Sequence, residues 1–207
     1  MKIAQIKPYK LHLNCICLEN GENVLMDKDV CVSHSLMADC EVDSETLEKI
    51  KFESDYVRAK SRALWYLDRM DYSEKALYNK LVEKGFSKKA CSKVLAKLVE
   101  LGLVDDRRYA ERLCEKLIES GHSKRAALQK MLLKGVPYDL AKEILSDAES
   151  DEVANILSLI EKKYASKLLE PENFQKVYAA LVRRGFSYSD VKTALKKYTE
   201  DLDFSEE

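Results

Sequence analysis

Glycine and proline are scarce in this chain, whose 207 residues include 6 glycines and 3 prolines. A β-sandwich or barrel needs many tight turns, which these two residue types supply, so the composition favours helices. No apolar run approaches the roughly 18 residues that a membrane span requires. The first ten residues have only a brief apolar patch, unlike a signal peptide. We therefore expect a mainly helical protein located in the cytoplasm.

The usual motifs of catalysis and metal binding are missing too. The sequence contains no G-x-G-x-x-G turn, no G-x-x-x-x-G-K phosphate loop and no H-E-x-x-H zinc motif. Its 3 histidines, His12, His34 and His122, do not have the spacing of metal ligands. Its carboxylates fall on polar helix faces beside lysine and arginine, where solvation explains them. We expect a binding protein without an active site, a cofactor or a metal.

The 6 cysteines form no C-x-x-C pair of the kind that binds zinc or does redox chemistry. Disulfides are also unexpected in the reducing cytoplasm. Cys91 and Cys114 fall on the apolar faces of predicted helices, where a thiol behaves as a small hydrophobic group. Both side chains are therefore expected to be buried.

Charge is spread unevenly along the chain, although the net charge is only -1. Residues 1–50 carry 5 basic and 9 acidic groups, residues 51–199 carry 30 basic and 22 acidic groups, and residues 200–207 carry 5 acidic groups. A basic middle can contact phosphates or an acidic protein surface. A solvated helical surface with charges of both signs explains the same numbers, so both interpretations stay open.

The first fifty residues have the period of a β-strand. In YKLHLNCICL (9–18), every second residue from Leu11 to Cys17 is leucine or cysteine. Asn20 and Gly21 then form a good hairpin turn. The stretches VLMD and DVCVS continue this β-rich segment, which we place at residues 1–52.

Helical spacing begins towards the end of that segment. A short helix is expected to start near Asp43 or Ser44, since either side chain accepts hydrogen bonds from the free N–H groups of a helix start. From about residue 53, apolar residues recur at intervals of three and four, which predicts helices around 56–67, 77–82 and 91–98. Each of these is too short to be stable alone, so they must pack together.

Three glycines, Gly85, Gly135 and Gly185, lie 50 residues apart, and their neighbours keep the same register. The residue ten positions after each glycine is leucine, and the residue four positions before it is leucine or methionine. This regularity is typical of a tandem three-helix repeat. We predict a mainly α-helical, elongated array of three repeats with an acidic tail, at residues 53–104, 105–148, 149–200 and 201–207.

Each repeat glycine marks a corner between two helices. Glycine permits the left-handed backbone conformation that ends a helix, and Ser87 and Ser187 can cap the helix that follows. Pro137 takes this place in the second repeat, where its missing N–H suits a first helical turn. Phe86 and Phe186 are expected to pack as hydrophobic staples. The starts of the preceding helices also carry good N-cap residues: Ser73, Ser123 and Asn173.

Basic residues recur along the predicted helices. Lys84, Lys134 and Arg184 directly precede the three repeat glycines, so a stacked array would present them as a spaced row that follows a polyanion. The tyrosines at positions 66, 78 and 178 either stack on bases or pack in the core. The candidate binding residues are Arg62, Lys80, Lys84, Arg107, Arg108, Lys124, Arg125, Lys134, Arg183 and Arg184.

The stretch ALWYLDRMDYSEKALYNKLVEKGFSKKACSKVLAKLVELGLVDDRRYAERL (63–113) resembles the RecX family of bacterial regulatory proteins. It has the family's Ser-x-x-x-Leu helix start at Ser73, its Leu-x-x-Lys-Gly-Phe corner at 81–86 and its Leu-Gly-Leu-Val-Asp-Asp-x-x-Tyr-Ala junction at 101–110. The likeness continues through the second repeat and, more loosely, through the third. The loops RMDYS and ESGHS (119–123) are less basic than usual for the family, so weaker phosphate contacts are expected there.

The resemblance implies a modulator of the RecA recombinase. RecX-like proteins bind the RecA filament on single-stranded DNA, lie along its helical groove and reduce its ATPase, strand-exchange and coprotease activities. The implied partners of this chain are therefore the RecA filament and single-stranded DNA, and the ten basic residues above are candidates for contact with either. We also expect a monomer that does not contact a membrane.

Two other classes of protein fit parts of the same pattern. A helix-turn-helix transcription regulator also has three short helices and a tight corner, and the predicted helix at 87–101 carries Lys88, Lys89, Lys93 and Lys97. The corresponding helix of the second repeat, at 137–147, has only one lysine. A helical-repeat adaptor that binds only proteins is the other alternative.

Overall fold

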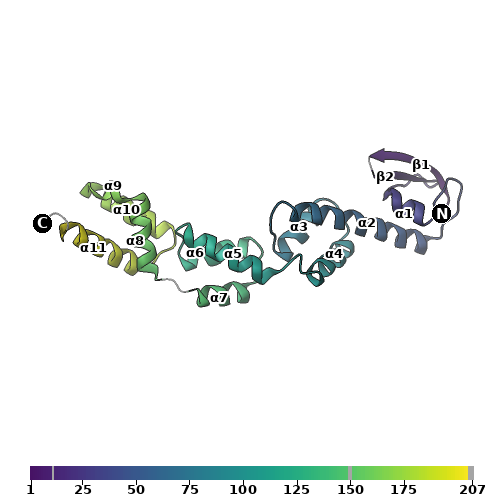
Figure 1. The fold of residues 1–207 in the computed structure, drawn as a ribbon. Coiled ribbons are helices and arrows are strands. Elements are labelled where there is room, and N and C mark those ends of the chain that lie inside the picture. The colour runs from purple at the N-terminus through teal and green to yellow at the C-terminus, as the bar shows by residue number, and fades with distance from the viewer. Residues whose placement is uncertain (11, 149–150, 205–207) are drawn as a thin grey trace. The chain divides into compact units, whose positions relative to one another are not determined.

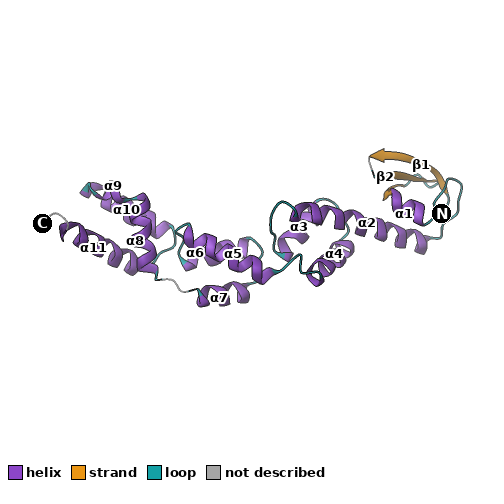
Figure 2. Cartoon of the chain, in the orientation of Figure 1, coloured by secondary structure: helices purple, strands orange, loops and turns teal. Residues whose placement is uncertain are grey.

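The computed structural model describes residues 1–10, 12–148 and 151–204 and is mainly helical (Figures 1 and 2). Within these ranges it has eleven α-helices, one short 3-10 helix and three β-strands. The chain divides into two compact units, Met1–Asp105 and Asp106–Glu207, called unit 1 and unit 2 below. The expected fold class, mainly α with three-helix repeats and a small N-terminal β-rich segment, is confirmed.

Unit 1 begins with an antiparallel sheet in the order β1-β2-β3. The strand period is confirmed, and Ile16 and Leu18 face the core while Cys15 and Cys17 are half-buried on the other face. The predicted turn after β2 contains Gly21 at a φ of 87°. Leu11 lies outside the described residues. The strands are β1 (Ile3–Lys10), β2 (Leu13–Leu18) and β3 (Asn23–Asp27).

The stretch DVCVS, which was expected to continue the β-rich segment, is helical instead. It lies within α1 (Lys28–Ser33). The carboxylate of Asp27 caps this helix by accepting a hydrogen bond from the N–H of Asp29 at 3.0 Å. Val30 and Cys31 are both buried, and two adjacent buried residues fit a helix better than a strand with one solvent face.

One long helix, α2 (Ser44–Leu67), replaces the two helices that were expected on either side of residue 53. Asp43 caps it as predicted, because its carboxylate accepts the N–H of Thr46 at 2.9 Å. Hydrogen bonds from the side chain and then the backbone of Thr46 lower the pKa of Asp43. The sequence of α2 contains neither glycine nor proline, so no helix-breaking residue separates its two halves. Its first half packs on the sheet and α1, and its second half belongs to the next core.

Each three-helix group has a core of its own. In unit 1, the second half of α2 packs with α3 and α4 around Leu77, Leu81 and Leu98. In unit 2, α5, α6 and α7 surround Met131, and α8, α10 and α11 surround Leu181. The helices are α3 (Glu74–Glu83), α4 (Lys88–Glu100), α5 (Asp106–Glu119), α6 (Lys124–Leu133), α7 (Tyr138–Asp147), α8 (Glu152–Lys163), α9 (Ala165–Leu168), η1 (Pro171–Asn173), α10 (Phe174–Arg183) and α11 (Tyr188–Phe204).

The three corners have the backbone that their glycines predict. Gly85, Gly135 and Gly185 have φ angles of 87°, 88° and 94°. Each glycine N–H donates to the carbonyl oxygen three residues earlier at 2.9 Å, so a free carbonyl at each helix end gains a partner. Ser87 and Ser187 then cap α4 and α11 by accepting backbone N–H groups at 3.4 Å and 3.1 Å. The local sequence of the corner therefore specifies its geometry.

The N-caps of the preceding helices agree with the sequence in two cases and differ in the third. Ser73 and Ser123 each accept the N–H of the residue three positions later, at 3.2 Å. Asn173 was expected to act in the same way, but among the described residues it makes no such bond. Its amide instead contacts Glu170 and Lys176, because the 3-10 helix η1 leads directly into α10 and holds Asn173 in helical conformation.

The two predicted buried thiols are confirmed, with Cys91 and Cys114 only 0% and 3% exposed. Burial raises the pKa of each thiol, which disfavours the reactive thiolate. All 6 cysteines are free. Across the described ranges, no helix combines the length and the apolar character needed to cross a membrane.

Candidate nucleic-acid interface

The structure separates the ten expected contact residues into two groups. Arg62, Lys80 and Lys84 belong to unit 1, and the other seven belong to unit 2. Among these seven, Arg107 and Lys124 have partners that link helices of the fold. The Arg107 guanidinium donates to the Glu143 carboxylate at 2.6 Å, which links α5 to α7. The Lys124 ammonium donates to the carbonyl oxygen of Ala148 at 2.7 Å.

Arg184 also has a structural role. Its guanidinium donates to the carbonyl oxygens of Ser120 and Gly121 at 3.4 Å and 3.3 Å, and its own carbonyl accepts the Ser123 hydroxyl at 3.3 Å. These bonds join the corner after α10 to the loop between α5 and α6. Lys84, at the equivalent position of the first repeat, is exposed at the end of α3. The row of cations expected from the repeat spacing therefore has members with different surroundings.

A basic groove is the most distinctive surface of unit 2. It has a volume of about 820 Å³, and its walls come from α6, the end of α8, α10 and the loops beside them. Lys130 enters it from α6, Lys163 from α8, Arg183 from α10, and Arg184 from the corner that follows. Among the described residues that line the groove, none is acidic. Four cations without a local counter-charge create a positive potential that attracts anions.

Close packing of the second and third repeats shapes this groove. A Cβ atom on Gly121 would lie 2.8 Å from the side chain of Leu159, and one on Gly185 would lie 2.5 Å from the Ser123 hydroxyl oxygen. Both glycines have positive φ, at 77° and 94°. The repeats approach each other because these two positions lack side chains. The close approach brings the cations of α6 and α10 to the two sides of one groove.

His122 lines the same groove and is half-buried. Its Nδ1 lies 3.2 Å from the carbonyl oxygen of Leu117 at the end of α5. Burial lowers the pKa of His122, and the nearby cations Lys130, Arg184 and Lys163 lower it further, although the contact with Leu117 acts in the opposite direction. At pH 7 the imidazole is therefore protonated to a smaller extent than that of an ordinary histidine.

A second hollow of about 490 Å³ adjoins the groove, since both are lined by Tyr164, Ala180 and Arg183. Lys167 and Lys176 add two more cations there. The described residues that line this hollow also include none that is acidic. The basic surface thus extends on both sides of Tyr164, whose half-buried ring lies among the cations. A chain of phosphates with attached bases matches this combination of cations and an aromatic ring.

In unit 1, cations lie over aromatic rings near the end of α2. The guanidinium carbons of Arg69 and Arg62 lie 3.6 Å and 5.2 Å from the centre of the Trp65 ring. The Lys80 ammonium lies 5.4 Å from the Tyr66 ring centre, within reach of a cation–π interaction. Trp65 is 45% exposed. Arg62 and Lys80 are thus placed beside aromatic rings of the protein itself.

The three tyrosines that were considered for base stacking all pack against cores. Tyr66 and Tyr78 are half-buried against the core of the first repeat, and Tyr178 against that of the third. Packing is a sufficient physical reason for each of these positions. Trp65 is more exposed than these three, and Tyr164 packs against the core of the third repeat while it also lines the basic groove. The sequence did not single out either residue.

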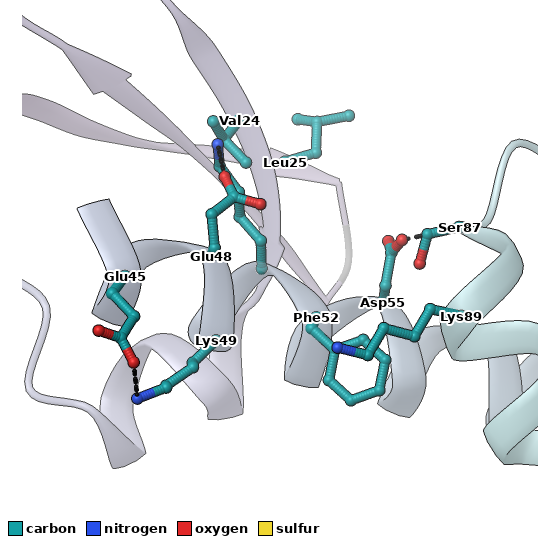
Figure 3. Close-up of a pocket in the computed structure, with 10 residues that line it drawn as sticks. Val24, Leu25, Glu45, Glu48, Lys49, Phe52, Asp55, Ser87 and Lys89 are labelled. Carbon is teal, nitrogen blue, oxygen red and sulfur yellow. Dashed lines mark hydrogen bonds and ion pairs between the residues drawn. The ribbon is translucent and has the colours of Figure 1, made fainter.

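A further hollow in unit 1, of about 550 Å³, has a different chemical character (Figure 3). Its walls come from β3, α2 and the start of α4. The Asp55 carboxylate there accepts the N–H of Ser87 at 3.0 Å, and the Lys89 ammonium lies 5.0 Å from the ring centre of Phe52. Glu45 and Lys49 form an ion pair at 2.7 Å. Charges of both signs balance here, so the groove of unit 2 is the better site for a polyanion.

The sequence identified only part of the groove. Arg183 and Arg184 were expected contact residues, but Lys163, His122 and Tyr164 were missed. The repeat spacing gives no signal for Lys163, since Leu113 stands 50 residues before it. The groove forms between two repeats, and a pattern within one repeat does not record it.

Fold and surface together define a class, that of helical-repeat proteins with a basic surface groove. Family models for RecX match two regions of the chain: the first three-helix domain at residues 59–98 and the third three-helix domain at 149–195. The regulatory protein RecX of Streptococcus mutans serotype c is 30% identical over 98% of this chain and 78% of its own length. The chain belongs to the RecX family.

Other comparisons agree with this assignment. The regulatory protein RecX of Clostridium tetani is 29% identical over 95% of this chain and 94% of its own length. A crystal structure of regulatory protein RecX superposes with a TM-score of 0.63 over 94% of this chain and 98% of its own, at 23% identity. The structure of RecX from Lactobacillus salivarius gives a TM-score of 0.60 over 69% of this chain and 96% of its own, at 22% identity. These two structures share the fold.

Proposed function

We propose that this protein regulates the RecA recombinase by binding the RecA filament on single-stranded DNA, and that it thereby reduces the ATPase, strand-exchange and coprotease activities of RecA. Membership of the RecX family supports the regulatory role. The observation that supports a contact with DNA is the basic groove of unit 2. The protein acts by binding, as a monomer in the cytoplasm, and is not itself an enzyme.

The proposed mechanism depends on several weak contacts acting together. The groove of unit 2 offers cations for the DNA backbone, and the end of α2 in unit 1 offers Trp65 with its two arginines. Contacts made by both units to one filament add their effects, because binding of the first unit raises the effective concentration of the second. The chain is therefore expected to act at less than one copy per RecA subunit.

ATP hydrolysis by RecA on single-stranded DNA tests this function. The full chain should reduce the rate when it is present at fewer copies than RecA. Arg183→Gln should weaken the effect, and Arg125→Gln should weaken it less, because Arg125 is an exposed cation of α6 that does not line the groove. A folded protein that leaves ATP hydrolysis by RecA unchanged would contradict the proposal.

One feature favours a duplex-binding role as the second candidate. Helix α4 carries Lys88, Lys89 and Lys93 on its exposed face, in the position of a recognition helix. However, the Lys89 and Lys93 ammonium groups lie over the Phe52 ring at 5.0 Å and 5.3 Å. Binding measured in parallel to a duplex and to a RecA-coated single strand separates the candidates, since a transcription regulator would prefer the duplex.

A further inference from the structure

The basic groove of unit 2 contains one group whose charge changes near neutral pH. We propose that the groove binds phosphate groups of a nucleic-acid backbone and that His122 contributes to this binding in its protonated form. The choice of nucleic acid as ligand rests on the proposed function. The proton-dependent contact of His122 goes beyond it and makes the strength of DNA binding depend on pH.

The ligand class follows from charge and size. Lys130, Lys163, Arg183 and Arg184 line the groove from three directions, and the described lining residues include no carboxylate. The groove and the hollow beside it have volumes of about 820 Å³ and 490 Å³. Sites of this size accommodate ligands as large as a nucleotide or more, whereas a single small anion would leave most of the space to water. A backbone with successive phosphates places a negative charge near each set of cations.

The hydrogen bond that His122 makes through Nδ1 determines whether its Nε2 acts as a donor or as an acceptor. In the tautomer that donates Nδ1–H to the Leu117 carbonyl at 3.2 Å, Nε2 carries no proton. A bare Nε2 is an acceptor, and it repels a phosphate oxygen. Protonation of Nε2 turns it into a charged donor, which forms a short, strong hydrogen bond to phosphate.

The charged groups that face His122 determine whether protonation of its ring strengthens or weakens binding of the strand. They are Lys130 on α6, Lys163 on α8, and Arg183 and Arg184 at the end of α10, all of them cations. In the free protein, burial and this positive field disfavour the imidazolium and lower its pKa. Bound phosphates offset the same field and favour the imidazolium. Binding of the strand therefore raises the pKa of His122, and a fall in pH strengthens binding.

The first test measures binding of a fluorescent oligothymidylate to the full chain between pH 5.5 and 8 at constant ionic strength. Lysine, arginine and carboxylate side chains change their charge little in this range, whereas histidine titrates within it. Affinity should rise by about 3- to 10-fold towards pH 5.5, which corresponds to a pKa increase of about half to one unit on binding. His122→Gln should abolish the rise, so that the affinity of this variant changes little between pH 8 and pH 5.5.

His34→Gln is the matched control. His34 lies in unit 1, 2.8 Å from Glu53, and the variant should keep the full pH dependence. An NMR titration of the His122 ring protons adds a direct measurement, in which the pKa should increase when the oligonucleotide binds. An unchanged pKa, or a pH dependence that persists in His122→Gln, would overturn the role of His122.

Ligand variants test the phosphate contact itself. A methylphosphonate oligonucleotide, whose backbone is uncharged, should bind weakly and without pH dependence, and millimolar inorganic phosphate should compete poorly with the phosphodiester strand. Equal binding of the uncharged strand would disprove phosphate recognition. Lys163→Gln should lower affinity for the strand at all pH values because Lys163 is an exposed lining cation; unaffected binding would show that the strand lies elsewhere. Inhibition of RecA, measured separately, tests the proposed function independently of these results.

Discussion

The corners at Gly85 and Gly185 have nearly the same sequence but different surroundings. Both glycines have left-handed backbones, at φ angles of 87° and 94°, and both donate their N–H at 2.9 Å to the carbonyl three residues earlier. Around Gly85, an added Cβ would meet no atom of the described residues within 4 Å apart from the glycine and its two chain neighbours. At Gly185, the added Cβ would lie 2.5 Å from the Ser123 hydroxyl and 2.9 Å from the Ala126 Cβ.

This difference shows that the same local motif has one structural role at Gly85 and two at Gly185. At Gly85 the motif turns the chain between α3 and α4 and leaves Lys84 exposed. At Gly185 it makes the same turn and also docks the third repeat against the second, with Arg184 bonded to Ser120 and Gly121. The residues of the corner determine its backbone conformation. Contacts with the neighbouring repeat determine which of their side chains remain accessible to a partner.

Truncation of the aromatic staple should give the largest difference between the two corners. Phe186 is 3% exposed, whereas Phe86 is half-buried. Phe186→Ala should lower the free energy of unfolding by about 4 kcal/mol because it leaves a cavity in a closed core, and Phe86→Ala by about 2 kcal/mol. Urea denaturation of the full chain, followed by circular dichroism, measures both. Equal losses would show that the two staples are equally enclosed.

Replacement of Gly85 and Gly185 by alanine should give the next largest difference in stability between the two corners. Gly85→Ala carries only the strain of a positive φ, about 1 kcal/mol, since its added methyl group enters open space. Gly185→Ala carries this strain together with a clash against Ser123 and Ala126, so it should lower the free energy of unfolding by about 3 kcal/mol. The same denaturation measurement applies.

An additional readout distinguishes strain from loss of docking. If Gly185→Ala displaces the third repeat from the second, the amide signals of Ser123 and Ala126 should shift in NMR spectra, whereas Gly85→Ala should leave them in place. A Gly185→Ala variant with wild-type stability would mean that the repeats do not pack as closely as the structure describes.

The same comparison explains what the sequence predicts and what it does not. Short-range features were predicted: Gly85 and Gly185 as turns, Ser73 and Ser123 as caps, and Asp43 at the start of α2. Each depends on residues close together in the chain, so its signal is local. The helix at DVCVS was missed because three successive apolar residues fit a strand as well as a helix, and the cap of Asp27 decides between them.

Long-range features were mostly missed. Two helices were predicted where α2 is continuous, since its two halves serve different cores and so have separate apolar patterns. The groove required knowledge of how the second repeat meets the third. Lys163 lines it and was missed, since the position 50 residues earlier holds Leu113, whereas Arg183 was an expected contact residue although Leu133 stands 50 residues before it. The repeat pattern that indicated the fold therefore does not predict these cations.

Replacement of the cations that precede Gly85 and Gly185 should give the smallest difference in stability between the two corners. It should also give a clear difference in binding. Arg184→Gln removes the guanidinium that bonds Ser120 and Gly121 and should cost about 1 kcal/mol of unfolding free energy, because charge-assisted hydrogen bonds to partly exposed carbonyls are moderately strong. Lys84→Gln should change stability by less than about 0.5 kcal/mol, as is usual for an exposed side chain. Its effect should appear only in filament binding, as a lower salt dependence, if Lys84 contacts a phosphate. Loss of stability in Lys84→Gln equal to that in Arg184→Gln would mean that both corners use the cation to hold the fold, and Lys84 would then cease to be a candidate contact residue.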